Sequence, residues 1–388
     1  MERNLKVLFA VQICMGTQFF LPVFFLFLRE NGLSWREIFA LEAIFTGSVM
    51  LLQIPAGMAA DRYGCKKVLT AGFLAGMLSF LVHANGTCFA AFALGNVLLA
   101  VLVACHAAGL ETITYATLAA LGRPTDFRRT IGALFFVSLL TLGLTSVIGG
   151  LVGMASLRLT LWLTFPAFAV GALCCNRLVQ PPLDKTAHVS LRQALGAVLQ
   201  PGWRLRTVMA VNIIFLTAVS VLGWIAPAYH LQVGTPEWVL GCSQAAGQMM
   251  SSCAARWTHR LETRIDDRVL LLSVAILLGL ALGGMILVGG YVGIALLILG
   301  RSCFGAISTL GSDLLHRLVN DRVRSRVQAL QGACLRAAMV AASLGIGSLL
   351  DGEAGLDTVL LLSLALGAVL ITTSLVCLNV VWPQKQPV

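Results

Sequence analysis

Twelve apolar stretches run through this chain, separated by polar or charged breaks. A helix needs about 20 apolar residues to cross the hydrocarbon core of a bilayer. The chain has 388 residues, 58% hydrophobic and 11% charged, with a mean hydropathy of +0.88, which excludes an ordinary soluble protein. The predicted fold class is an all-α polytopic membrane protein with 12 transmembrane helices, near Leu5 to Leu28, Trp35 to Ala59, Val68 to His83, Cys88 to Ala120, Phe127 to Leu151, Leu157 to Leu178, Thr207 to Leu231, Pro236 to Trp257, Val269 to Val288, Tyr291 to Leu315, Val327 to Leu350 and Leu356 to Val381.

The distribution of basic residues predicts the orientation of these helices. Of the 27 Lys and Arg residues, 22 fall in alternate segments that include both termini, and the opposite segments hold only Arg29, Arg36 and Arg158. Cytoplasmic loops carry the excess of Lys and Arg in membrane proteins. Both termini are therefore predicted to be cytoplasmic. The net charge of +10 follows from topology, so it indicates no nucleic-acid partner.

One short segment between the second and third apolar stretches is the most specific motif of the chain. It reads Gly57-Met58-Ala59-Ala60-Asp61-Arg62-Tyr63-Gly64-Cys65-Lys66-Lys67. It resembles the loop 2-3 motif of the major facilitator superfamily, G-x-x-x-D-R-x-G-R-R-K, with Cys65 at the place of the first basic residue. The resemblance implies a secondary transporter of two six-helix bundles, with a gating motif formed by Gly57, Asp61, Arg62, Gly64, Lys66 and Lys67.

The chemistry of this gating motif fits that role. Gly57 and Gly64 allow close helix approach and a tight turn, and Asp61 can accept hydrogen bonds or pair with an Arg at a helix end. Such pairs can hold one face of a transporter shut. The alternative interpretation is an ordinary loop that follows the positive-inside rule.

A second resemblance lies in the fourth apolar stretch. The segment from Glu111 to Leu118 is similar to the E-A-L-L-Y-D-S-L pattern of a drug-exporter-like branch of the superfamily, and departs from it at Ala116. The fifth stretch keeps Gly149-Gly150 of the antiporter motif but has Thr145-Ser146 where Gly-Pro is expected. Asn96 stands where many proton-coupled members carry Arg.

The chain also divides into two related halves. The longest polar segment, Arg177 to Arg206, separates six apolar stretches from six, which predicts an amino-terminal bundle at 1-178, a cytoplasmic linker at 179-206 and a carboxyl-terminal bundle at 207-388. Shifting the second half back by about 195 residues places Arg301 on His106. Parallel repeats of six helices are typical of this superfamily.

Ionisable residues at membrane depth are costly and are therefore candidates for function. Glu42 follows a Ser34/Glu37 capping box, and is either a cavity-facing group or one paired near the outer interface. Glu111 lies near the midplane, with Tyr115 one turn away. Arg301 and Arg336 must meet water, an acidic partner or an anionic solute, because arginine keeps its charge. The predicted substrate or coupling residues are Glu42, His106, Glu111, Tyr115, Gln244, Gln248, Arg301 and Arg336.

Other chemistries find no support in the sequence. The 11 cysteines form no C-x-x-C pair, so we expect no metal site and no disulfide framework. No phosphate-binding G-x-x-x-x-G-K-[ST] loop occurs, so ATP is not the direct energy source. We also expect no cofactor, with a proton gradient as the energy source, and no enzymatic constellation of paired carboxylates or an activated serine.

The sequence thus predicts a secondary active transporter of a small organic solute, anionic or zwitterionic, that works by rocker-switch alternating access and is proton-coupled. The alternatives left open are efflux of lipophilic compounds and a non-transporting membrane receptor with this fold. We expect a monomer in the cell membrane, the inner membrane of a bacterium, whose partners are the solute and the lipid bilayer.

Overall fold

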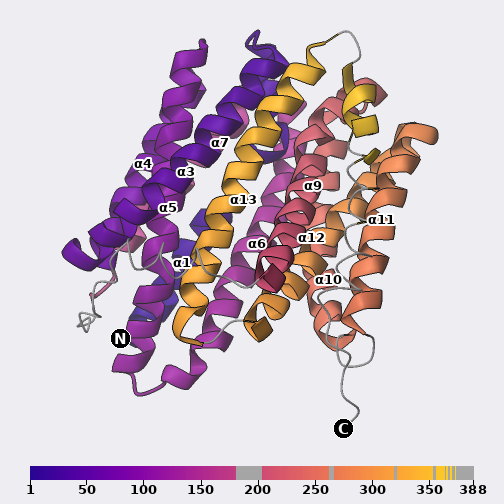
Figure 1. The fold of residues 1–388 in the computed structure, drawn as a ribbon. Helices are drawn as coiled ribbons and strands as arrows, with labels where there is room; N and C mark the ends of the chain where they lie inside the picture. Colours follow the sequence, from indigo (N-terminus) through magenta and orange to yellow (C-terminus); the bar gives the residue numbers. More distant parts are fainter. Residues whose placement is uncertain are drawn as a thin grey trace. The chain divides into compact units, whose positions relative to one another are not determined.

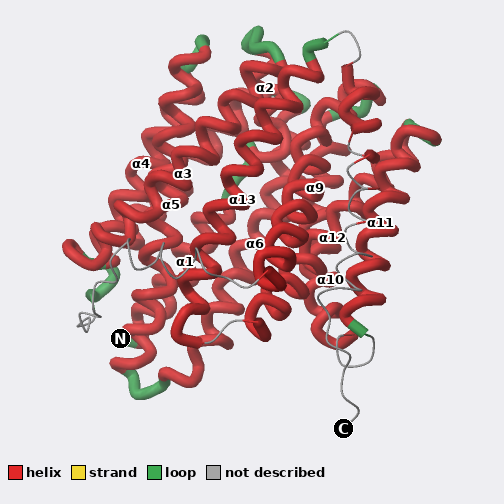
Figure 2. The backbone as a smooth tube through the Cα atoms, in the orientation of Figure 1, coloured by secondary structure: helices red, strands yellow, loops and turns green. Residues whose placement is uncertain are grey.

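The computed structural model describes residues 1–180, 203–261, 266–318, 321–352 and 355–362, with single positions at 364, 365, 368 and 372. Every regular element among these residues is helical, as Figure 2 shows. Ten of the described helical segments are long and apolar enough to cross a membrane. The predicted span Pro236 to Trp257 forms a helix that is not among these ten, and most of Leu356 to Val381 lies outside the described residues.

The chain forms two compact units. The first comprises Met1–Thr186 together with Thr235–Ala245, and the second comprises Ala187–Gly234 together with Ala246–Val388. The change from first to second unit at Thr186 falls inside the expected linker 179–206. Residues 181–202 of that linker lie outside the described residues, so the predicted domain boundaries stay a prediction.

The first unit is a bundle around a core of phenylalanines. Phe27, Phe73, Phe80, Phe92 and Phe168 are almost fully buried. Helix α4 packs against both α5 and α7. Helix α3 packs against α5, and the ribbons of α3, α4 and α5 lie side by side in Figure 1. The elements are α1 (Glu2–Gly16), η1 (Leu21–Val23), α2 (Phe24–Glu30), α3 (Trp35–Tyr63), α4 (Cys65–Asn85), α5 (Phe89–Ala120), η2 (Pro124–Asp126), α6 (Phe127–Gly153) and α7 (Leu157–Asn176).

Local sequence signals set the ends of α3. The Ser34 hydroxyl accepts from the backbone N–H of Glu37 at 3.2 Å, and the Glu37 carboxylate accepts from the backbone N–H of Ser34 at 2.8 Å. This confirms the predicted capping box. At the other end, Gly64 has a φ of +91°, a conformation that glycine adopts without strain, and α4 starts at the next residue.

The first membrane span differs from its prediction, because it is not one continuous helix. Helix α1 ends at Gly16, and the chain returns to helical geometry only at η1 and α2, so the break lies at the centre of the span Glu2–Glu30. At the break, the Thr17 hydroxyl donates to the Ile13 carbonyl at 2.8 Å, so this carbonyl keeps a hydrogen-bond donor where the helix ends. Pro22 has no N–H to continue the ladder.

The second unit contains α9 (Trp203–Val233), α11 (Asp267–Leu287), α12 (Gly290–Leu318) and α13 (Asp321–Leu350), and the larger part of α10 (Glu237–Leu261). Helix α12 packs against α9 and α11, and α13 packs against α9. Glycines make this packing close: a Cβ on Gly300 would lie 2.8 Å from the Leu222 side chain. The buried core of this unit includes Leu222, Leu278 and Leu297.

Candidate functional site

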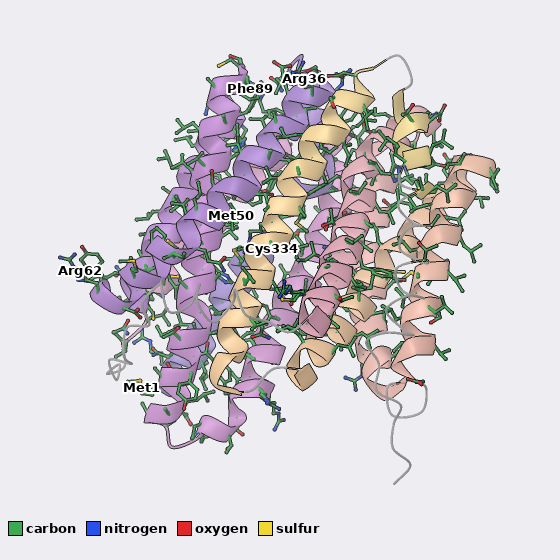
Figure 3. All side chains as sticks on the ribbon, in the orientation of Figure 1. Met1, Arg36, Met50, Arg62, Phe89 and Cys334 are labelled. Carbon is green, nitrogen blue, oxygen red and sulfur yellow. The ribbon has the colours of Figure 1, made fainter. Side chains whose placement is uncertain are left out.

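The gating motif lies where α3 ends and α4 begins. Figure 3 shows Arg36 and Arg62 at opposite ends of α3. Asp61 and Arg62 are exposed in the last turn of α3, and the Arg62 guanidinium lies 5.2 Å from the centre of the Tyr63 ring. In the described part of the chain, Arg123 forms an ion pair with Asp126 at 2.7 Å, whereas Asp61 has no ion-pair partner there. Gly57 has open space beside its Cα, and Lys67 is exposed.

A residue after α7 completes this turn. The side-chain carbonyl oxygen of Gln180 accepts from the backbone N–H of Lys66 at 3.0 Å. Gly64, the N-cap residue of α4, has no side chain to satisfy the first N–H groups of that helix. A Cβ on Gly64 would lie 3.0 Å from the same Gln180 oxygen. Gln180 therefore caps α4 from a position 114 residues away in the sequence.

Asn4 fixes the chain next to Gln180. Its side-chain amide donates to the Val179 carbonyl at 2.8 Å and to the Thr117 hydroxyl at 3.3 Å, and its oxygen accepts from the Val179 N–H at 2.9 Å. Asn4 is 1% exposed, so these bonds are shielded from water. Neither Asn4 nor Gln180 was predicted from the sequence; the signal available for Asn4 was a polar residue at the start of an apolar stretch.

Inside the first unit, His106 contacts α1. Its Nε2 lies 2.6 Å from the Gln12 side-chain oxygen, and the Gln12 amide nitrogen lies 3.5 Å from the Leu134 carbonyl of α6. His106 is near the centre of the span Phe89–Ala120. The structure thus joins α1, α5 and α6 through one polar chain at membrane depth.

The predicted carboxylates lie apart from this chain. Glu111 and Tyr115 are exposed on α5, and the Tyr115 ring meets the Phe127 ring edge-on with 5.7 Å between centroids. Glu42 is half-buried on α3 and accepts from the Thr46 hydroxyl at 3.3 Å. In the described part of the chain, the hydrogen-bond partner of His106 is Gln12, and neither Glu42 nor Glu111 hydrogen-bonds to its ring.

His83 is a buried residue whose bonds are all internal. Its Nδ1 lies 2.9 Å from the Ser79 carbonyl, and its Nε2 lies 3.1 Å from the Asn96 side-chain oxygen. The Asn96 amide in turn donates to the Leu41 carbonyl at 2.8 Å. His83 is 1% exposed. This network ties α3, α4 and α5 together, which is a structural role for Asn96 at the position where the resemblance expects Arg.

In the second unit, the Arg301 side chain packs next to two glycines of neighbouring helices. It is at the centre of the span Gly290–Gly311. A Cβ on Gly247 of α10 would lie 3.2 Å from the Arg301 Nε, and a Cβ on Gly223 of α9 would lie 3.9 Å from its guanidinium carbon. The two glycines therefore leave the space that the arginine side chain fills. His230 of α9 is close enough to Arg301 for an electrostatic interaction.

The other predicted residues of α10 and α13 are half-buried. Arg336 lies along α13, with its Nη1 3.6 Å from where a Cβ of Gly332 would be. The Gln248 backbone carbonyl accepts from Ser252, and Gln244 lies one turn earlier on α10. Among the described residues, no group of three or more His, Cys, Asp or Glu side chains is placed to hold a metal ion.

Comparisons with known proteins agree with this architecture. A sequence model of the Major Facilitator Superfamily matches residues 7–343. A search of curated protein sequences gave no match. The fold is similar to crystal structures of the nucleoside transporter NupG. A mutant form aligns with a TM-score of 0.84 at 14% identity over 96% of this chain and 98% of that chain. A second NupG structure aligns with a TM-score of 0.76 at 15% identity over 97% and 98%.

Proposed function

This chain belongs to the major facilitator superfamily, a family of transporters and not of enzymes, and we propose that it moves a small acidic or zwitterionic organic solute across the cell membrane by alternating access. The observation that carries the proposal is the placement of Arg301. An arginine at the centre of a membrane span keeps its charge, and such residues mark substrate or ion pathways. The glycines of α9 and α10 give its side chain room beside two neighbouring helices.

A guanidinium at this depth favours a carboxylate or phosphate. Arginine binds such groups through charge-assisted hydrogen bonds, often two at once. Arg336 adds a second permanent cation in the same half of the sequence, whereas the carboxylates Glu42 and Glu111 belong to the other half. An anionic or zwitterionic solute fits this distribution of charge.

We propose proton coupling as the energy source, without any bound cofactor. Glu111 on α5 is the first candidate for the coupling group, since it is an exposed carboxylate within the span Phe89–Ala120 and ionisable residues within membrane spans mark proton relays. Glu42 is the next candidate. We also propose that the protein works as a monomer in the inner membrane of a bacterium, with both termini in the cytoplasm, in line with the excess of Lys and Arg in those segments.

A thermal-unfolding screen on the purified full-length protein tests the solute class. Lactate and alanine are compared with uncharged lactamide and uridine, in wild type and in Arg301→Lys. We expect the acids to raise the unfolding temperature of wild type. Loss of the paired guanidinium hydrogen bonds should weaken acid binding about tenfold or more in the Lys variant. An equal effect on lactamide and lactate would contradict an acid-binding role.

The second candidate function is transport of a neutral, ring-containing solute. The fold likeness to the nucleoside transporter NupG favours it. In that case uridine stabilises the wild-type protein more than lactate does, and Arg301→Lys affects stability without changing the preference among solutes. Efflux of lipophilic compounds and a non-transporting receptor remain the alternatives; proteoliposomes that bind a solute without moving it would favour the receptor.

A further inference from the structure

The chain that follows α7 is held in place by Asn4. We call the three residues Leu178–Gln180 the strap. The Asn4 side-chain oxygen accepts from the Val179 N–H at 2.9 Å, and its amide nitrogen donates to the Val179 carbonyl at 2.8 Å. One carboxamide thus bonds both backbone groups of one residue, as the opposite residue of a β-ladder would. The side chain of Leu178 is 1% exposed, so the strap is also anchored in the core.

The last residue of the strap reaches the gating motif. The Gln180 side-chain oxygen accepts from the Lys66 N–H at 3.0 Å, and it would lie 3.0 Å from a Cβ on Gly64. Between these two motif residues, Cys65 is 0% exposed, although Lys67 further along is exposed. The turn that Gln180 caps therefore keeps a buried thiol inside the gating motif.

The two attachments of the strap differ in how well they are shielded from water. Asn4 is 1% exposed and also donates to the Thr117 hydroxyl of α5 at 3.3 Å. Gln180 is half-buried and bonds the Lys66 N–H through a long, flexible side chain. A hydrogen bond that water can replace is easier to break than one in a dry, low-dielectric environment. The Asn4 end of the strap is therefore the firm attachment, and the Gln180 end is the one that can open.

We propose that the strap is a latch on the gating motif: the Gln180 contact holds the turn between α3 and α4 in one conformation, and Asn4 is the positioning residue that sets the strap for this contact. Val179 and Gln180 are also the first residues of the predicted linker, 179–206, so a movement of the linker acts on the gating motif through them. All of these contacts lie within the first unit. The effect of the latch on transport rests on the proposed function, whereas the latch itself does not.

The native thiol of Cys65 reports whether the latch is closed. Full-length protein in nanodiscs is labelled with N-ethylmaleimide, and the rate at each cysteine is followed by peptide mass spectrometry. We expect Cys65 to react about two- to thirtyfold faster in Gln180→Ala than in wild type, because loss of a cap makes local opening more frequent by that factor. Gln180→Glu keeps an acceptor and should react as slowly as wild type. An unchanged rate in Gln180→Ala would overturn the latch.

Cys14 of α1 is the internal control for this measurement. It is 7% exposed and lies in the same core as Cys65. Opening of the turn leaves that part of α1 packed, so the labelling rate of Cys14 should not change in any variant. If Cys14 and Cys65 accelerate by the same factor, the whole bundle has loosened, and the latch is wrong.

The role of Asn4 is tested by combining variants. Asn4→Ala should accelerate Cys65 labelling about as much as Gln180→Ala does, and the double variant should be no faster than either single variant, because both act on one contact. Thr117→Val is the matched control, since it removes another partner of Asn4 and leaves the pair with Val179 intact. Additive effects in the double variant, or the same acceleration in Thr117→Val, would overturn the positioning role.

Uptake of lactate by proteoliposomes tests whether the latch acts in the transport cycle. Gln180→Ala and Asn4→Ala should change the initial rate by the same factor, whereas Thr117→Val should keep the wild-type rate. Faster labelling of Cys65 with unchanged uptake would show that the strap only stabilises the turn, and would overturn its role in gating. Absence of lactate uptake in wild type would contradict the proposed solute class instead, and the labelling rates would still decide the latch.

Discussion

The side-chain hydroxyl of Thr145 on α6 donates to the carbonyl oxygen of Gly16, the last residue of α1, at 3.0 Å. The Thr145 hydroxyl oxygen also accepts a hydrogen bond from the backbone N–H of Gln18 at 3.3 Å. One threonine thus bonds the chain on both sides of Thr17, where the first span leaves helical geometry. The carbonyls of the two residues before Gly16 also have donors. The Gln18 side-chain amide donates to the Met15 carbonyl at 2.8 Å, and the Thr17 backbone N–H donates to the Cys14 carbonyl at 3.2 Å.

This relationship gives Thr145 a physical role at a position where the family resemblance expects Gly-Pro. The broken segment of the first span also packs closely against α6. A Cβ on Gly149 of α6 would collide with the Phe19 carbonyl, so only glycine fits at this position. Broken helices are tolerated at membrane depth where neighbouring groups satisfy the freed backbone. Thr145 is such a group for the first span.

Replacing Thr145 by Val should destabilise the first unit. The substitution keeps the shape but leaves the Gly16 carbonyl and the Gln18 N–H without their partner, which costs about 1–3 kcal/mol for a buried group. Thermal unfolding of the purified protein measures the loss. Thr141→Val is the matched control, since the Thr141 hydroxyl donates only to Val137 of its own helix at 2.8 Å. Equal destabilisation by both variants would show that the hydrogen bonds of Thr145 to Gly16 and Gln18 add no stability of their own.

The Asp61→Asn variant should slow transport strongly and leave membrane insertion intact. Asp61 is exposed and has no ion-pair partner among the described residues, and a carboxylate that pairs in only one state of the cycle shifts the balance between states. Solute uptake by proteoliposomes measures the effect. Asp126→Asn removes the partly exposed carboxylate that pairs with Arg123 and should change uptake little. Wild-type rates in Asp61→Asn would rule out a gating role.

Removing the cap that Gln180 provides should loosen the start of α4. Gln180→Ala leaves the Lys66 N–H without its acceptor, and loss of a cap costs about 0.5–2 kcal/mol of helix stability. Hydrogen exchange at the amides that follow Gly64 should become faster. Gln180→Glu keeps an acceptor and adds a negative charge at a helix N-terminus, which is favourable, so exchange should stay slow. Fast exchange in both variants would show that the cap depends on more than the oxygen.

Adding a methyl group at Gly247 should displace Arg301. The new Cβ would lie 3.2 Å from the Arg301 Nε, closer than ordinary contact allows. We expect Gly247→Ala to weaken lactate binding more than lactamide binding in the thermal-unfolding screen. Gly345→Ala in α13 is the control, because a Cβ there has open space. If lactate binding survives in Gly247→Ala, the position of the guanidinium is not critical for the solute.

Local chemistry in the sequence was enough to predict several features. Apolar length located ten of the predicted spans among the described residues, because a helix in lipid must be long and apolar to cross. The Ser34/Glu37 box set the start of α3, since its two residues lie three positions apart and need no other part of the chain. The gating motif was correctly placed between two helices for the same reason: its glycines and charges lie in one short segment.

Only the tertiary structure decided which polar residues meet. His106 and Gln12 are 94 residues apart, Lys66 and Gln180 are 114 apart, and Thr145 and Gly16 are 129 apart. Hydropathy gives the depth of a residue in the bilayer, but not the rotation of its helix or the identity of the neighbouring helix. Those follow from how side chains and glycines of different helices pack against one another, so the partners of Gln12, Gln180 and Thr145 could not be read from the sequence.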